Sequence, residues 1–196
     1  MHEANREWWR LCEKKYTPYF KNISRVLEVG SLNINGSVRE HFENIDTYIG
    51  LDWRPGRFVD MVCLAHEMEF DQSFNTIISC SMLEHDPYWY ASIVRMVRFL
   101  CDDGGLFLSW GAARCAPHEV HTAPDQQYHA LPADKVIKLL NALGLYIHEF
   151  QYESAMPCRQ GTDKGWGEVA LVAFKDKQYA MGESFIAPLL EDDLKA

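Results

Sequence analysis

The stretch that decides the fold is Val26-Leu27-Glu28-Val29-Gly30-Ser31-Leu32-Asn33-Ile34-Asn35-Gly36-Ser37, followed by Tyr48-Ile49-Gly50-Leu51-Asp52-Trp53. An apolar run that carries an acid and is broken by Gly30 predicts a buried strand and then a tight turn, where backbone can approach a ligand. Asp52 follows Gly30 by about 20 residues, the separation at which an acid ending the second strand meets ribose hydroxyls in nucleotide-binding βαβ units. The two segments therefore predict one crevice at the carboxyl edge of a parallel sheet.

Side chains at the end of the second segment suit a nucleoside. The carboxylate of Asp52 can accept hydrogen bonds from both vicinal hydroxyls of a ribose, and Trp53 offers an aromatic face for a purine. Glu28 brackets the same crevice from the first strand. A structural interpretation stays open, in which Asp52 only ends a strand and Trp53 belongs to the core.

Strand-like and helix-like segments alternate along the rest of the chain, and the last two strand-like runs have no helix between them. The predicted strands are residues 25–29, 48–51, 58–62, 74–79, 106–110, 146–152 and 168–174. The predicted helices are residues 3–21, 37–42, 90–100 and 132–143. We therefore predict an α/β fold with a Rossmann-like, seven-stranded sheet in three αβα layers, six strands parallel and the last antiparallel.

Length and composition predict one domain, residues 1–196. The chain has 196 residues, of which 47% are hydrophobic and 13% aromatic, enough for one sizeable core and too many for a disordered chain. Residues 1–22 are expected to form an N-terminal helical cap and residues 179–196 a C-terminal tail that docks on the domain or on a partner. For the adjacent pair Trp8 and Trp9, packing is favoured over a role as a lid above a ligand.

The net charge of the chain disfavours some classes of binding partner. A formal net charge of −9 and a pI near 5.3 argue against a nucleic-acid partner and favour a small-molecule or protein substrate. No apolar run is long enough to span a membrane and the polar start does not resemble a signal peptide, so we expect a cytoplasmic protein. The 6 cysteines are widely spaced without a Cys-x-x-Cys pair, which is typical of reduced thiols.

Several segments together carry a family resemblance. They are Glu28-Val29-Gly30-Ser31-Leu32-Asn33-Ile34-Asn35-Gly36-Ser37, Gly50-Leu51-Asp52-Trp53-Arg54-Pro55-Gly56, Val59-Asp60-Met61-Val62-Cys63-Leu64-Ala65-His66-Glu67, Ser81-Met82-Leu83-Glu84-His85 and Asp102-Asp103-Gly104-Gly105-Leu106. In this order and spacing the chain resembles class I S-adenosylmethionine-dependent methyltransferases, most of all the small bacterial type with this first loop. The resemblance covers residues 26–145.

The resemblance implies S-adenosylmethionine as cofactor and methyl transfer to a nucleophile on a small molecule or a protein. It implies roles for nine residues in cofactor binding. Glu28, Gly30 and Ser31 would hold the methionine portion, Asp52 the ribose, Trp53, Ala65 and His66 the adenine, and Ser81 and Met82 the sulfonium end. The chain departs from the family at Leu32 and Ile34, where further glycines are usual, and at Leu64, where an acid often accepts from the adenine amino group. These departures keep an alternative open, a non-catalytic binding or interaction module with the same fold.

His85 is the candidate catalytic residue. The resemblance places it near the transferred methyl group, and an imidazole can take a proton from an attacking hydroxyl or amine near neutral pH. Methyl transfer often needs little acid–base help, because alignment of the reactants does most of the work. His85 is therefore also open to a structural interpretation, as the residue that opens the next helix.

The long polar connection over residues 111–131 is the first place to expect substrate contacts, because loops of this length in compact domains are usually functional. The candidates for substrate binding are His121, Tyr128 and His129. The spacing of His118, Glu119, His121, Asp125 and His129 matches neither His-Glu-x-x-His nor a zinc finger, so no metal site is predicted.

One further motif resembles a nucleic-acid enzyme only superficially. Asp86-Pro87-Tyr88-Trp89 resembles the Asp-Pro-Pro-Tyr signature of enzymes that methylate amino groups of bases, but the second proline is absent and the motif comes only after the five-residue run from Ser81 to His85. Together with the acidic charge, this disfavours a nucleic-acid base as the acceptor.

Overall fold

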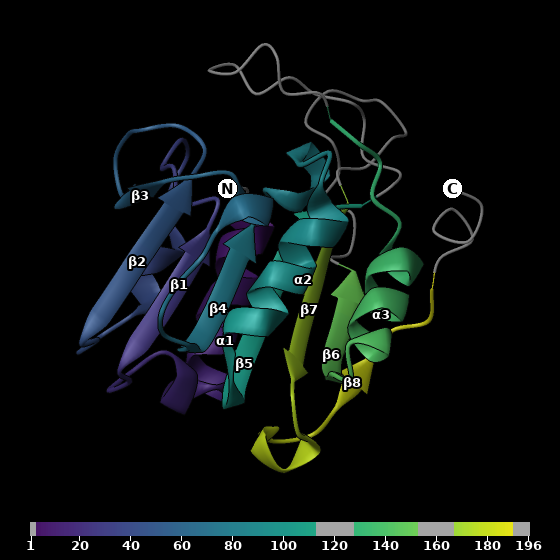
Figure 1. Ribbon diagram of the computed structural model, residues 1–196. Helices are drawn as coiled ribbons and strands as arrows, with labels where there is room; N and C mark the ends of the chain where they lie inside the picture. The colour runs from purple at the N-terminus through teal and green to yellow at the C-terminus, as the bar shows by residue number, and fades with distance from the viewer. Residues whose placement is uncertain (1–2, 113–127, 153–166, 190–196) are drawn as a thin grey trace.

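The computed structural model describes residues 3–112, 128–152 and 167–189 (Figure 1). The helices are α1 (Glu3–Lys15), α2 (Trp89–Phe99) and α3 (Ala133–Ala142), with 3-10 turns η1 (Thr17–Tyr19), η2 (Val38–His41), η3 (Ala65–Glu67), η4 (Leu83–His85) and η5 (Lys177–Tyr179). The strands are β1 (Arg25–Val29), β2 (Thr47–Asp52), β3 (Met61–Val62), β4 (Phe74–Cys80), β5 (Leu100–Gly111), β6 (Tyr146–Tyr152), β7 (Glu168–Phe174) and β8 (Phe185–Ile186).

The strands form one sheet in the order β3-β2-β1-β4-β5-β7-β6-β8. The pairs from β3 to β5 are parallel, whereas β7 is antiparallel to both of its neighbours, β5 and β6. This confirms the predicted fold, with six of the first seven strands in one direction and the last reversed. The short β8, which pairs parallel with β6, was not predicted.

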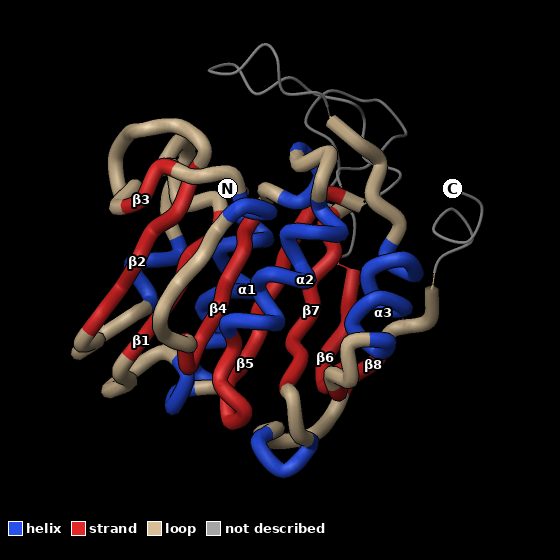
Figure 2. The backbone as a smooth tube through the Cα atoms, in the orientation of Figure 1, coloured by secondary structure: helices blue, strands red, loops and turns tan. Residues whose placement is uncertain are grey.

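Helices cover both faces of the sheet (Figures 1 and 2). On one face α2 and α3 pack over a core that includes Leu27, Ile77 and Leu108. On the other face α1 packs over a second core, rich in aromatic rings, that includes Phe107 and Phe174. The two cores result from the alternation of side chains along buried strands, which are apolar on both faces in a parallel sheet.

Some predicted elements are shorter than expected. The N-terminal helix ends at Lys15, and Pro18 lies in η1, because proline is tolerated only in the first turn of a helical segment. The predicted helix over residues 37–42 is the single turn η2. The predicted strand over residues 58–62 is wrong except for Met61–Val62, because Phe58 takes a left-handed conformation with φ 71° that interrupts an extended strand.

The tryptophan pair of α1 packs in the core. Trp8 is 3% exposed and Trp9 is fully buried, and their rings meet edge to face with centroids 4.6 Å apart. This burial supports the packing interpretation of the pair.

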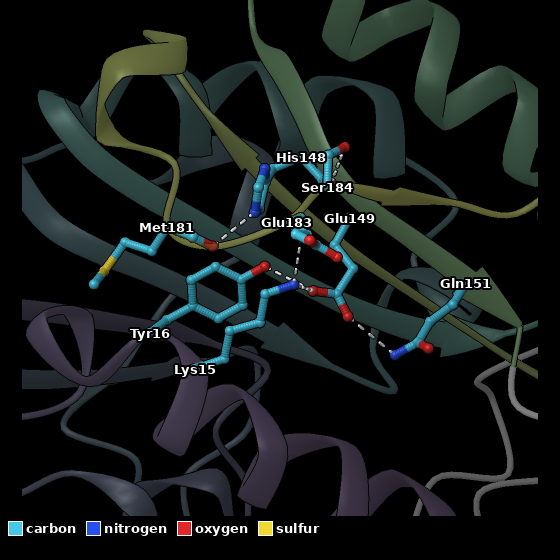
Figure 3. A network of polar contacts seen from close by, with 8 residues as sticks. All are labelled: Lys15, Tyr16, His148, Glu149, Gln151, Met181, Glu183 and Ser184. Atoms are coloured by element: carbon cyan, nitrogen blue, oxygen red, sulfur yellow. Dashed lines mark hydrogen bonds and ion pairs between the residues drawn. The ribbon is translucent and has the colours of Figure 1, made fainter.

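The described part of the C-terminal tail docks on the domain. Lys15 Nζ donates to Glu149 Oε2 (2.8 Å) and to the carbonyl of Glu183 (3.0 Å), and Tyr16 Oη donates to the same Glu149 oxygen (2.7 Å) (Figure 3). His148 donates from Nε2 to the carbonyl of Met181 (2.9 Å). The end of α1, the strand β6 and the segment before β8 are therefore tied together by one polar network.

Candidate functional site

A cavity of about 440 Å³ opens at the carboxyl ends of β1, β2, β3 and β4. Its size suits one small-molecule ligand, and its position agrees with the rule that ligands bind at this edge of open α/β sheets. The lining residues are Gly30, Leu51, Asp52, Trp53, Cys63, Leu64, Ala65, His66, Met82, His85, Asp86, Pro87 and His129.

The turn after β1 forms one wall of the cavity. Gly30 has φ 86°, and a Cβ added there would lie 2.5 Å from Cβ of Met82, so only glycine fits this position. The amides of Gly30 and Ser31 both donate to the carbonyl of Leu51, at 2.8 and 3.0 Å. The first loop is thereby fixed across the end of β2 and brings its backbone close to Met82.

Asp52 ends β2 and faces the same wall. Its carboxylate accepts from the amide of Leu32 through Oδ2 and from the amide of Arg54 through Oδ1, both at 3.1 Å. Only 8% of the residue is exposed, and burial raises the pKa of the Asp52 carboxyl, while the backbone amides act in the opposite direction. Each carboxylate oxygen keeps a second lone pair for a ligand.

Aromatic rings frame the mouth of the cavity. The guanidinium of Arg54 lies over the ring of Trp53 at 4.1 Å from its centroid. The rings of His66 and Tyr88 lie 4.3 Å apart between centroids, and the carbonyl of His66 accepts from Nε of Arg95 (3.3 Å). Trp53 and His66 both line the cavity, and aromatic rings in a lining suit a planar ligand such as a purine.

The residues after β4 form the far wall. Met82, His85, Asp86 and Pro87 lie in and around the turn η4, before α2 begins at Trp89. The amide of His129 donates to the carbonyl of Glu84 (2.6 Å). Two imidazoles, from His85 and His129, thus line one cavity although they lie far apart in the sequence.

Glu84 lies behind this wall. The residue is only 2% exposed, and burial raises the pKa of its carboxyl to about 7. Its Oε2 atom has no hydrogen-bond partner among the residues that the structure describes.

The structure brings most of the predicted site residues together. Those lining the cavity are Gly30, Asp52, Trp53, Ala65, His66, Met82, His85 and His129. Their binding roles stay predictions, but their grouping supports the proposed position of the site. His121 lies outside the described residues. Tyr128 is not a lining residue, but its ring meets that of His85 edge to face with centroids 6.0 Å apart, and its hydroxyl donates to the carbonyl of Ala112 (2.6 Å).

Three predicted cofactor residues do not line the cavity. Glu28 is 3% exposed and accepts from Tyr48 Oη (2.8 Å), and burial raises the pKa of Glu28 to about 8. The Ser31 hydroxyl is buried and has no hydrogen-bond partner among the described residues. Ser81 accepts from Asn5 Nδ2 (3.2 Å). These residues support the loops around the cavity.

Five lining residues were not predicted as site residues: Leu51, Cys63, Leu64, Asp86 and Pro87. Leu51 and Leu64 each stand next to a residue that was predicted to bind the cofactor. Their position in the sequence could therefore have indicated that they line the same cavity. Asp86 and Pro87 belong to the motif interpreted above, and its distance from β4 gave no sign that it reaches the cavity. Among the described residues, no group of His, Cys, Asp and Glu could hold a metal ion.

Comparisons with known proteins add evidence on the fold. No protein-family profile and no curated protein matches the sequence. The N-methyltransferase NodS from Bradyrhizobium japonicum WM9 matches in structure with a TM-score of 0.61 at 16% identity, over 87% of this chain and 95% of that chain. The 1,6-didemethyltoxoflavin-N1-methyltransferase from Burkholderia thailandensis matches with a TM-score of 0.62 at 15% identity, over 87% and 77% of the two chains.

The fold is that of class I S-adenosylmethionine-dependent methyltransferases. Solved structures of both proteins named above contain S-adenosylhomocysteine. The [4+2]-cyclase SpnF is also similar, with a TM-score of 0.61 at 16% identity, over 86% of this chain and 80% of that chain. This fold therefore also occurs in a protein named for another reaction, and fold alone does not define the activity.

Proposed function

We propose that this protein is an S-adenosylmethionine-dependent methyltransferase that acts on a nucleophile of a small molecule or a protein. The observation that carries the proposal is the cavity at the carboxyl edge, where Gly30, Asp52 and Trp53 meet as nucleoside binding requires. The acidic net charge supports a partner other than nucleic acid. No helix in the described part of the chain is long and apolar enough to cross a membrane.

The residues present fit the cofactor. Asp52 would hold the ribose hydroxyls, since its oxygens retain acceptor capacity beside their two backbone bonds. Trp53, Ala65 and His66 would border the adenine, and Gly30 and Met82 would lie along the sulfur.

When bound, the cofactor supplies a methyl group on a sulfonium, which is a good leaving group. The protein then has to orient the acceptor in line with that group and keep water away from it. His85 and His129 line the far wall, and either imidazole suits the removal of a proton from an attacking hydroxyl or amine. We assign this role to His85, which the resemblance places near the methyl group.

A second candidate function is cofactor binding without methyl transfer. It is favoured by Leu64, an exposed apolar residue in the lining where the family often has an acid, and by Glu28, which is bonded to Tyr48 instead of facing the cavity.

Calorimetry with S-adenosylmethionine and S-adenosylhomocysteine tests the proposal first. We expect both to bind, and the absence of binding at millimolar cofactor would contradict both candidate functions. A screen of metabolite and protein extracts with methyl-labelled cofactor then separates them. Transfer of label that is lost in an Asp52→Asn variant supports the enzyme, whereas tight binding without transfer to any extract favours the binding module.

A further inference from the structure

We propose that Asp86 binds a positively charged group of the methyl acceptor, so that the substrate class is a cationic amine. This inference rests on the proposed function and adds to it the charge of the substrate and a residue that holds it. Asp86 belongs to the Asp86-Pro87-Tyr88-Trp89 motif, to which the proposed function assigns no role. A carboxylate recognises an ammonium group through charge-assisted hydrogen bonds.

The described lining of the cavity carries acids but no permanently charged cation. Its carboxylates belong to Asp52 and Asp86, and it contains no lysine or arginine. Two arginines contact lining residues from outside, and both are engaged. Arg54 lies over the neighbouring tryptophan ring, and Arg95 forms an ion pair with Glu69. A negatively charged acceptor would therefore meet like charges in this cavity, without a fixed cation in the described lining to hold it.

The two acids of the lining belong to different walls. Asp52 ends β2, and the proposed function assigns its oxygens to the ribose. Asp86 belongs to the far wall, between the turn η4 and α2, and directly follows His85, to which we assign the removal of a proton. In Figure 1 the start of α2 lies at the edge of the sheet toward which β1, β2 and β4 point. Asp86 is therefore the acid on the side of the cavity where the acceptor is expected.

The Asp86 carboxylate is held in place without being neutralised. Its Oδ1 atom accepts from the amide of Tyr88 (2.8 Å), and its Oδ2 atom accepts from the hydroxyl of Ser92, a fully buried residue. Both donors are uncharged, and Asp86 forms no ion pair with any residue that the structure describes. Each oxygen keeps a second lone pair for a ligand. A cation in the cavity would thus supply the charged partner that these residues do not.

The same two hydrogen bonds also tie the loop before α2 to the first turn of that helix, which is a structural task. A neutral acceptor such as an asparagine oxygen can perform this task, since a capping group only has to accept from its donors. A cationic ligand requires the negative charge in addition. Substitutions that separate the charge of Asp86 from its hydrogen bonds therefore test the proposal.

Calorimetry with matched probes measures the charge preference of the cavity. The full chain is saturated with S-adenosylhomocysteine and titrated with butyl, cyclohexylmethyl, phenylethyl and indolylethyl compounds, each as the amine, the alcohol and the carboxylate. We expect at least one amine to bind about tenfold more tightly than its alcohol, with the carboxylate weakest, and we expect this preference to shrink in high salt. Asp86→Asn should bind that amine and its alcohol equally well.

Two further variants separate the charge from the structure. Ser92→Ala removes one hydrogen bond of Asp86 but keeps the charge, so it should keep the preference for the amine. Asp71→Asn removes an exposed charge before β4 begins, at the opposite edge of the sheet, and should leave the preference unchanged. Asp86→Ser, which also keeps an acceptor oxygen, takes the place of Asp86→Asn if that variant does not fold.

Each result has a definite meaning. The proposal is wrong, while cofactor binding stands, if the unaltered protein binds alcohols or carboxylates as tightly as amines, or if no amine binds at millimolar concentration. A preference that Ser92→Ala loses as completely as Asp86→Asn would overturn it too, because the effect would then belong to the start of α2. If S-adenosylhomocysteine itself does not bind, the proposed function fails, and titration of the free protein with the amines tests Asp86 separately.

Discussion

At the scale of single residues, Asp52 combines two tasks. Its carboxylate holds the amides of Leu32 and Arg54, and the same oxygens are the proposed acceptors for the ribose hydroxyls. Asp52→Asn keeps an acceptor oxygen and loses the charge. We expect affinity for S-adenosylhomocysteine to fall about tenfold to a hundredfold and the free energy of unfolding to fall by about 1 kcal/mol.

Calorimetry and urea denaturation of the same samples separate the two effects. Asp46→Asn, an exposed acid just before β2, is the matched control and should change neither quantity. Unchanged affinity in Asp52→Asn would show that Asp52 has only a structural role.

Glu28 gives stability a particular pH dependence. Burial raises its pKa to about 8, above the ordinary value of 4.5 that applies in the unfolded chain. The folded state therefore holds a proton that the unfolded state has lost between these values, so stability falls as pH rises from about 4.5 to 8, by at most about 1.4 kcal/mol per pH unit. Glu28→Gln should flatten this slope.

Urea denaturation at pH 5.5 and pH 8 measures the slope, with Glu40→Gln at an exposed position as control. Tyr48, Arg39, Asp52 and Asp60 also act on the Glu28 carboxyl. An equal slope in the unaltered protein and Glu28→Gln would therefore assign the dependence to another group, such as Glu84.

The sequence predicted site residues better where backbone geometry determines which residue can occupy a position. It predicted them less well where the direction of a side chain determines its contacts. Gly30 and Asp52 were identified because a turn and a strand end constrain which residue can stand there. Glu28 accepts a hydrogen bond from Tyr48 on the neighbouring strand and does not line the cavity, an arrangement that a linear motif does not show because it does not indicate which cross-strand residue meets a buried acid.

At the scale of elements, the segment before β8 depends on an uncharged histidine. Burial lowers the pKa of His148, whose Nε2 donates to Met181 while Nδ1 has no partner among the described residues (Figure 3). The unfolded chain therefore takes up a proton at higher pH than the folded one. The stability that docking contributes is present above the ordinary histidine pKa and is lost as pH falls below about 6.5.

Hydrogen exchange tests this at the amide of Ala187, which donates to the carbonyl of Phe150. After correction for the intrinsic rate, we expect faster exchange at pH 5 than at pH 7, and no such change in His148→Gln. His41→Gln, paired with Glu13 elsewhere, is the control. Acceleration that persists in His148→Gln would show that His148 is not the group responsible.

Strands were predicted well where the run of apolar residues is long and a glycine or a charged residue follows its end. The strands β1, β6 and β7 have the predicted bounds. The strand β3 was overestimated because Asp60 accepts from the amide of Gly50 (2.8 Å), which folds the preceding loop back on β2. The strand β8 has only two residues, too few for a recognisable pattern.

At the scale of the whole molecule, a ligand that binds only the folded state must raise thermal stability. At a concentration of S-adenosylhomocysteine 100 times its dissociation constant, the stabilisation is about 2.7 kcal/mol, which corresponds to roughly 5–10 °C in Tm for a domain of this size. Differential scanning fluorimetry measures the shift, and Asp52→Asn at the same ligand concentration should shift less. No rise at millimolar ligand would contradict the proposed cofactor.

The order of the sheet also has a consequence for biosynthesis. Because β7 lies between β5 and β6, the strand at residues 168–174 fills an interior position although it is among the last to be made. When β5 and β6 have emerged from the ribosome, β7 has not yet been made. Each of the two strands then lacks the partner that pairs with it in the folded sheet. Two strand edges then stay open to pairing with other chains until nearly the whole protein has emerged. Premature termination before residue 168 would thus remove an interior strand of the sheet and leave a product prone to aggregation.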